Sequence, residues 1–154
     1  MSSEETRVIL RHIIRGGGER SGTAQRLAEA LRAAGGYRWL GLYDVGPEEI
    51  AAVAWSGGGE PAFPRFPRTQ GLCGSAASSG ATVLVPDVRR DPRYLTTFGN
   101  TLSEMIVPVR DPVTGRVAGL IDVESDRAGA FTEDDRAFFE ECAADLADFW
   151  RTGS

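Results

Sequence analysis

The apolar positions at both ends of the chain follow the spacing of amphipathic helices. Residues 4–14 place Val8, Leu10 and neighbouring aliphatic residues along one side of a helix, and Ser2 or Ser3 is suited to cap its start. A second helix is predicted from Ser21 or Thr23 to Ala34, where Gly35-Gly36 ends it. A last helix is predicted to begin at Thr132, which forms a capping-box pattern with Asp135. Its apolar face consists of Phe138, Phe139, Cys142, Leu146, Phe149 and Trp150.

The middle of the chain has the alternating pattern of strands. Strands are predicted over residues 37–45, 50–55, 82–85, 103–109 and 116–124, with a short helix over 73–79. Residues 56–69, rich in glycine and proline, are predicted to form a loop without regular structure. A second long loop spans residues 86–102, with at most one helical turn, and loops of that length commonly cover a site.

This order of elements predicts an α+β fold. We expect one domain over residues 1–154, with an antiparallel sheet, terminal helices on one face and a pocket under loops on the other. A chain of this length, 42% hydrophobic and 25% charged, has the composition of a globular domain with a sizeable core.

Charge and composition exclude several classes of function. The net charge is −5, and the 17 basic residues are all arginines scattered along the chain, so a nucleic-acid partner is not expected. No apolar run approaches the roughly 20 residues of a membrane helix, and the N-terminus does not resemble a secretory signal, which predicts a cytoplasmic protein. Two cysteines and one histidine are too few for a structural zinc site, so neither a metal nor another cofactor is expected.

Three acidic residues on neighbouring strands are candidates for a binding site. In the last strand, Asp122 and Glu124 alternate with apolar residues and face the loops, and Glu104 lies on the preceding strand. Together with the rings of Trp39 and Tyr43, these carboxylates would suit an ammonium group. The alternative is that the acids form the solvated side of an antiparallel sheet, and periodicity alone favours this alternative.

The two cysteines differ in their surroundings. Cys73 lies at the predicted start of a short helix, where the helix dipole would lower its pKa and make it reactive; a small buried residue is an equally supported interpretation. Cys142 lies on the apolar face of the last helix and is assigned to the core. His12 has no partner nearby in the sequence, so no Ser-His-Asp or Cys-His site is expected.

Over about residues 20–150, the sequence resembles a GAF domain, and within that class the free methionine-(R)-sulfoxide reductase group. The resemblance rests on six segments that occur in order and at similar spacing. They are Trp39-x-Gly41-x-Tyr43, Gly71-Leu72-Cys73-Gly74-Ser75-Ala76-Ala77, Val85-Pro86-Asp87-Val88, Ser103–Val109, Gly119–Ser125 and Phe131–Asp135.

The resemblance implies a six-stranded antiparallel sheet, a ligand on the face away from the terminal helices, and a homodimer formed through those helices. It places Glu104, Asp122 and Glu124 on the acidic positions for the substrate ammonium, and Trp39 and Tyr43 on an aromatic wall. It also implies that Cys73 matches the resolving cysteine, whereas Thr97 stands where those reductases have their nucleophilic cysteine. A threonine hydroxyl cannot carry out the redox chemistry of a sulfur nucleophile.

The expected function is therefore a small-molecule-binding GAF domain, acting as a stand-alone sensor or binding module for an amine or amino-acid-like ligand. The alternative is a divergent reductase that uses Cys73 and an external thiol. A purely structural dimerisation module is a third possibility, which a pocket filled with side chains would favour. The acidic pocket makes a phosphate-bearing ligand such as a cyclic nucleotide less attractive, because like charges would meet.

Overall fold

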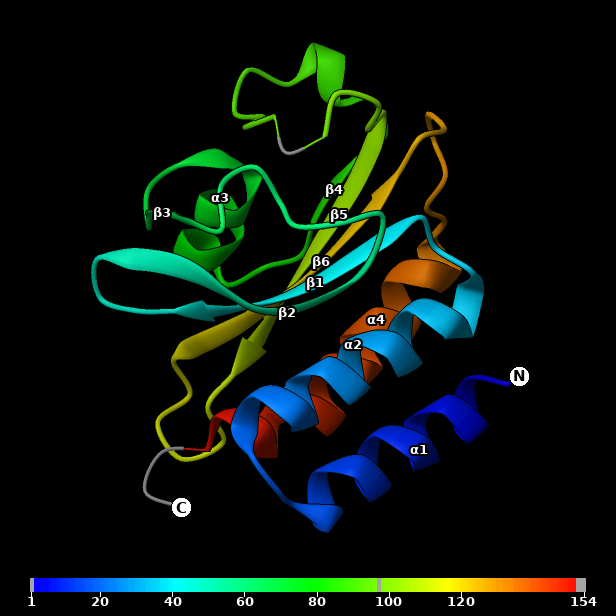
Figure 1. Cartoon of the computed structure of the whole chain (residues 1–154). Helices are drawn as coiled ribbons and strands as arrows, with labels where there is room; N and C mark the ends of the chain where they lie inside the picture. The colour runs from blue at the N-terminus through cyan, green and yellow to red at the C-terminus, as the bar shows by residue number, and fades with distance from the viewer. Residues whose placement is uncertain (1, 97, 152–154) are drawn as a thin grey trace.

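The computed structural model describes residues 2–96 and 98–151. These residues form a six-stranded sheet in the order β3-β2-β1-β6-β5-β4, in which every neighbouring pair is antiparallel. Three helices cover one face of the sheet, while a short helix and long loops cover the other (Figure 1). The predicted α+β architecture is confirmed.

The helical layer consists of α1 (Ser3–Gly16), α2 (Arg20–Gly35) and α4 (Glu133–Leu146), and α4 continues into the 3-10 turn η2 (Ala147–Trp150). The side chain of Ser2 accepts a hydrogen bond from the backbone N–H of Glu5, which satisfies an otherwise free donor at the start of α1. Thr132 and Asp135 form the predicted capping box at the start of α4. The local sequence therefore specified both of these helix starts.

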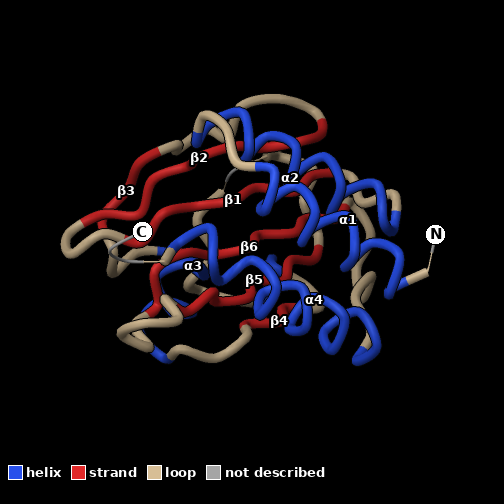
Figure 2. The backbone as a smooth tube through the Cα atoms, turned by 90° about the horizontal axis from the view of Figure 1, so that it is seen from below, coloured by secondary structure: helices blue, strands red, loops and turns tan. Residues whose placement is uncertain are grey.

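The sheet consists of β1 (Trp39–Val45), β2 (Glu49–Gly57), β3 (Arg65–Pro67), β4 (Val83–Val85), β5 (Ser103–Arg110) and β6 (Val117–Ser125). Figure 2 shows the strands running behind α1, α2 and α4, with β1, β6 and β5 in the middle of the sheet. Strands β1 and β2 form the predicted antiparallel hairpin.

Strand β3 corrects the prediction that residues 56–69 have no regular structure. Its three residues pair with Glu49–Ala51 at the edge of the sheet, and Phe66 is buried between two exposed neighbours. The segment was missed because three residues, of which the last is Pro67, carry too little alternation to indicate a strand. A strand at the edge of a sheet tolerates proline.

The second face is covered by α3 (Gly71–Ser79), the 3-10 turn η1 (Val88–Arg90) and the loops around them. In Figure 1, α3 lies on the opposite side of the sheet from α1, α2 and α4. The predicted short helix and the single helical turn in the 86–102 loop are both confirmed.

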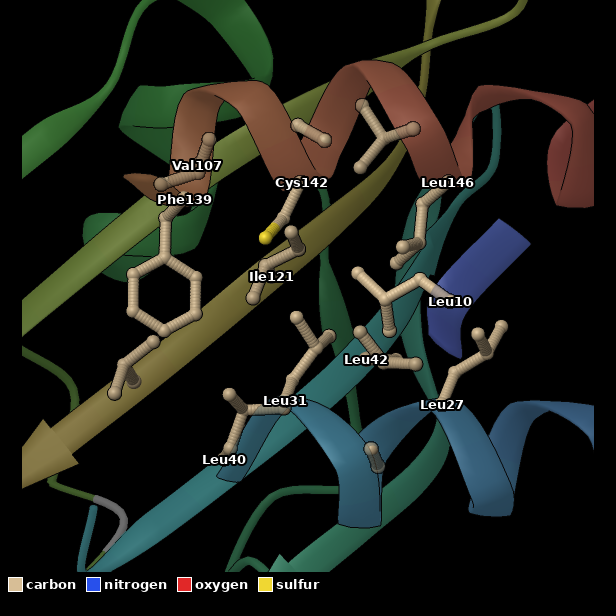
Figure 3. Close-up of a cluster of buried hydrophobic side chains, with 14 of the residues drawn as sticks. Leu10, Leu27, Leu31, Leu40, Leu42, Val107, Ile121, Phe139, Cys142 and Leu146 are labelled. Atoms are coloured by element: carbon tan, nitrogen blue, oxygen red, sulfur yellow. The ribbon is translucent and has the colours of Figure 1, made fainter. Parts of the chain in front are cut away.

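A leucine-rich core fills the space between the sheet and the three long helices. Leu27 and Leu31 of α2 meet Leu40 and Leu42 of β1, and all four are fully buried (Figure 3). Alternation along β1 separates these leucines from Trp39 and Tyr43, which belong to a second cluster on the opposite face. Among the described residues, no helix is both long and apolar enough to cross a membrane.

Candidate functional site

Strand register brings three carboxylates together on the face opposite the long helices. Glu104 of β5 lies directly across from Glu124 of β6, and Asp122 is two residues from Glu124 on the same face. One carboxylate oxygen from each of the three residues lies within 4.8 Å of the others. Like charges directly opposite one another weaken a sheet, so this arrangement is costly for folding alone.

All three acids are buried, which shows that their interpretation as the solvated side of the sheet is wrong. Glu104, Asp122 and Glu124 are 4%, 2% and 0% exposed. Alternation correctly predicted the face on which they lie, but α3 and the loops exclude water from that face. Buried carboxylates are rare unless they are paired or hydrogen-bonded, because leaving water disfavours their charged form.

Burial and mutual repulsion shift the protonation of the cluster. Burial is the main cause that raises the pKa of Glu124 from 4.5 to about 8, and the charge of Asp122 adds to it. Burial also raises the pKa of Asp122 from 3.8 to about 6. The pKa of Glu104 is raised well above its ordinary value by burial, by the charges of Asp122 and Glu124, and by a hydrogen bond to Asp122. Without a cation, the cluster therefore retains protons near neutral pH.

Two residues that the sequence did not single out support Glu124. The Thr101 hydroxyl donates to Glu124 Oε1 at 2.7 Å, and Arg38 Nη2 donates to Thr101 Oγ1 at 2.7 Å. The guanidinium of Arg38 also lies over the ring of Phe98, 5.1 Å from its centre. Neither Arg38 nor Thr101 belongs to a pattern that indicates function, since they come from separate segments that only the fold brings together.

Cys73 is in the predicted place but has the opposite electrostatic surroundings. It lies in the first turn of α3, and its thiol donates to Asp122 Oδ2 over 3.7 Å. Burial, and then the charges of Asp122, Glu104 and Glu124, raise the pKa of the Cys73 thiol well above 9.0. The expected lowering by the helix dipole is therefore wrong, because the nearby carboxylates dominate over the helix terminus.

The aromatic residues pack beside the acids. Gly41 has no side chain, and a Cβ there would clash with the indole of Trp39, so the glycine lets this ring lie flat over β1. The Trp39 ring is fully buried, its Nε1 donates to the carbonyl of Gly59 at 2.9 Å, and Phe98 packs edge-on against it. Tyr43 packs between Trp39 and Phe66, with ring centres 6.5 Å and 6.0 Å away.

A small cavity of about 20 Å³ lies against the acid cluster. Glu104, Asp122, Cys73 and Tyr43 line it together with Phe63, Phe66, Gly71, Leu72 and Leu95. Trp39 and Glu124 lie behind this lining rather than in it. The volume suits about one water molecule or a small ion, whereas a larger ligand requires the covering side chains to move.

Comparison with known proteins identifies the family. Residues 19–148, most of the chain, match the GAF domain family. The chain is a GAF domain. The fold and the six-stranded antiparallel sheet agree with this assignment.

This GAF domain is similar to proteins named as free methionine-R-sulfoxide reductases. It is 32% identical to the one from Saccharomyces cerevisiae over 106 residues, which cover 68% of this chain and 58% of the yeast protein. The X-ray structure of free methionine-R-sulfoxide reductase from Neisseria meningitidis in complex with its substrate superimposes with a TM-score of 0.87 at 26% identity, over 96% of this chain and 87% of that one.

Another relative has a name that states no activity. Protein YtsP of Bacillus subtilis is 30% identical over 108 residues, which cover 70% of this chain and 65% of YtsP. The matched region thus spans less than two thirds of YtsP and of the yeast protein. Similarity to the family therefore establishes the domain and leaves its ligand to be argued from the site.

Two further predictions concern residues away from the acid cluster. Cys142 is fully buried among the leucines under α4 (Figure 3), so the sheet separates it from Cys73, as expected, and both thiols are free. Thr97, predicted to replace a catalytic cysteine, lies outside the described residues.

Proposed function

We propose that this GAF domain binds a small molecule carrying a protonated amine, with the amine at the Glu104, Asp122 and Glu124 carboxylates. The observation that carries the proposal is the burial of three converging acids on one face of the sheet. A fold gains nothing from such a cluster by itself, whereas a cationic ligand converts mutual repulsion into attraction.

The neighbouring residues have distinct roles in this proposal. The three carboxylates accept hydrogen bonds from the ammonium group, and Tyr43, with Trp39 behind it, supports the apolar part of the ligand. Because the cavity measures about 20 Å³, an amino-acid-sized ligand requires Phe63 and Leu95 to move outward. Phe63 is 44% exposed, so its displacement disrupts little packing.

Calorimetric titration with amino acids and small amines, including free methionine-(R)-sulfoxide, tests this proposal. For a ligand that binds the wild type, Glu104→Gln should weaken binding by about tenfold or more, because a charge-assisted hydrogen bond is lost. Asp126→Asn is the matched control, since it removes an exposed acid two residues from Glu124 and should leave affinity unchanged. Unchanged affinity in Glu104→Gln would refute the assignment of the site.

A second candidate function is reduction of free methionine-(R)-sulfoxide, supported by the relatives named for it and by the position of Cys73 on the cavity. In this reaction the Cys73 thiolate attacks the sulfoxide sulfur, the S–O bond breaks as the oxygen passes to Cys73, and one proton is taken up from solvent, which gives the thioether and a sulfenic acid on Cys73. An external thiol then forms a mixed disulfide with release of water, and a second thiol restores Cys73. The external thiol is required because Cys142 lies across the sheet. The raised pKa of Cys73 disfavours its thiolate, so we rank this function second.

A turnover assay with dithiothreitol, and then with thioredoxin, separates the two functions. An enzyme should lose all turnover in Cys73→Ser, whereas a binding module should show no turnover and still bind its ligand. Turnover that survives Cys73→Ser would exclude the Cys73 mechanism. The sensory role and the homodimer expected from the resemblance remain predictions, and the latter is checked by light scattering.

A further inference from the structure

The acid cluster contains oxygen atoms that the fold leaves without hydrogen-bond donors. When Glu104 is ionised and its hydrogen bond to Asp122 is lost, the buried atoms Asp122 Oδ1 and Glu124 Oε2 have no donor among residues 2–96 and 98–151. The other oxygen of each group is occupied, Asp122 Oδ2 by the Cys73 thiol and Glu124 Oε1 by the Thr101 hydroxyl. Unsatisfied buried oxygens on two adjacent carboxylates indicate that something else binds them.

We propose that Glu104, Asp122 and Glu124 form a binding site for a divalent cation of the size of Ca²⁺ or Mn²⁺. Three atoms no more than 4.8 Å apart lie within about 2.8 Å of a common point, close to the roughly 2.3–2.6 Å of calcium–oxygen bonds. Small inward movements of the side chains complete the coordination. Mg²⁺ fits less well, because it demands oxygens at about 2.0–2.1 Å in strict octahedral geometry.

The charge of the fully ionised site matches that of a dication. Three ionised acids carry three negative charges, and Arg38, which acts on Glu104 and Glu124 through its charge, offsets one of them. A doubly charged ion balances the two that remain, whereas one ammonium group balances the site when one of the acids keeps its proton. The oxygens are also too close together to hold two separate ammonium groups.

The size and the atoms of the site favour a hard ion. The cavity of about 20 Å³ beside Glu104 and Asp122 has room for one water of the ion's coordination shell. Carboxylates and water are the ligands that Ca²⁺ and Mn²⁺ prefer, and Cys73 remains a thiol that donates to Asp122 rather than a thiolate ligand. The sequence-based expectation of no metal rested on the lack of zinc ligands and did not consider an all-oxygen site.

This inference stands apart from the proposed function, although both occupants would use the same carboxylates. A domain that binds Mn²⁺ and no amine would refute the first proposal alone, and a domain that binds an amine and no metal would refute the second alone. If both bind, they must compete.

The test is a titration of the chelator-treated full chain with Mn²⁺ alone at pH 8, followed by the electron paramagnetic resonance signal of free Mn²⁺ and by calorimetry. We expect one Mn²⁺ per chain, displaced by Ca²⁺, with release of protons from the acids. Asp122→Asn and Glu124→Gln should each weaken binding by about tenfold or more, because each removes a charged ligand. Asp126→Asn should bind Mn²⁺ as the wild type does.

Thermal unfolding provides a second readout that does not depend on one variant. Mn²⁺ and Ca²⁺ should raise the melting temperature of the wild type and of Asp126→Asn by the same amount, and should raise that of Glu124→Gln by less at the same metal concentration. If one variant fails to fold, the remaining substitutions at Glu104, Asp122 or Glu124 still test whether these acids bind the metal ion. Absence of stoichiometric Mn²⁺ binding, or equal binding in the wild type and the folded variants, would overturn the proposal.

Discussion

The two faces of the sheet are built from the same strands but have different roles. On the helical face, Leu40 and Leu42 of β1 are fully buried against leucines of α1 and α2. On the opposite face, the same strand contributes Trp39 and Tyr43 to a cluster that also encloses a cavity and three acids. The first face is an apolar core of buried side chains, and the second buries three acidic groups that repel one another.

This difference indicates where the domain gains stability and where it gives stability up. Close packing of apolar side chains contributes favourably to folding, and fixed negative charges in the same interior oppose it. Departures from good packing concentrate at functional sites, so the acid-bearing face is the one that we assign to binding. Substitutions on the two faces should therefore have opposite effects on stability.

The largest effect is expected on the helical face. Leu42→Ala should lower the free energy of unfolding by about 2–5 kcal/mol, because it removes a buried side chain and leaves a cavity among the leucines. Urea denaturation measures the change. Val8→Ala is the control on α1, since Val8 is 48% exposed and its truncation should change stability by less than about 0.5 kcal/mol. If Leu42→Ala lowered the free energy of unfolding no more than Val8→Ala does, the claim that the helical face stabilises the domain would be contradicted.

On the acid-bearing face, removal of a charge should stabilise the metal-free domain. Glu124→Gln keeps the shape of the side chain but removes a carboxylate whose pKa is raised to about 8. We expect the free energy of unfolding at pH 8 to rise by about 1–3 kcal/mol, because the unfolded chain no longer gains from ionising this group. The same substitution should weaken binding of cations. Destabilisation comparable to that of Leu42→Ala would show that the charge is structurally required.

The pH dependence of stability should come from the same face. An acid whose pKa is raised by folding binds more protons in the folded state, so its contribution to stability is greatest below its unfolded pKa and is lost as pH rises through its folded pKa. For Glu124 this window runs from about pH 4.5 to about pH 8, and for Asp122 from about 3.8 to about 6. Denaturation curves over this range should show falling stability for the wild type and a flatter profile for Glu124→Gln. If Glu124→Gln left the dependence of stability on pH unchanged, Glu124 would not be a source of that dependence.

The smallest effect is expected in the reactivity of Cys73. Its thiolate is disfavoured by burial and by three neighbouring acids, so alkylation by iodoacetamide at pH 8 should be at least about tenfold slower than for a free thiol. Glu104→Gln should accelerate the reaction, since one of the charges that raise the pKa is removed. Mass spectrometry distinguishes Cys73 from Cys142, whose pKa is raised to about 12 in the opposite core. Rapid alkylation of Cys73 in the folded wild type would favour the reductase hypothesis.

Local sequence determined the elements and the direction in which their side chains point. Helix starts follow from capping side chains such as Thr132, which bind backbone groups only a few residues away. Alternation along β1 and β6 correctly separated the leucine face from the acidic face, because side chains of a strand point to opposite sides in turn. The motifs around Cys73 and Asp122 also indicate the GAF family by their residues and spacing alone.

Only the tertiary structure decided what covers the acidic face. Whether Glu104, Asp122 and Glu124 meet water depends on α3 and the loops, which come from other parts of the chain. The support of Glu124 by Thr101 and Arg38, the edge strand around Phe66 and the raised pKa of Cys73 likewise depend on contacts between distant segments. Periodicity specifies the face to which a residue belongs, whereas burial and charge depend on every group that packs against that face.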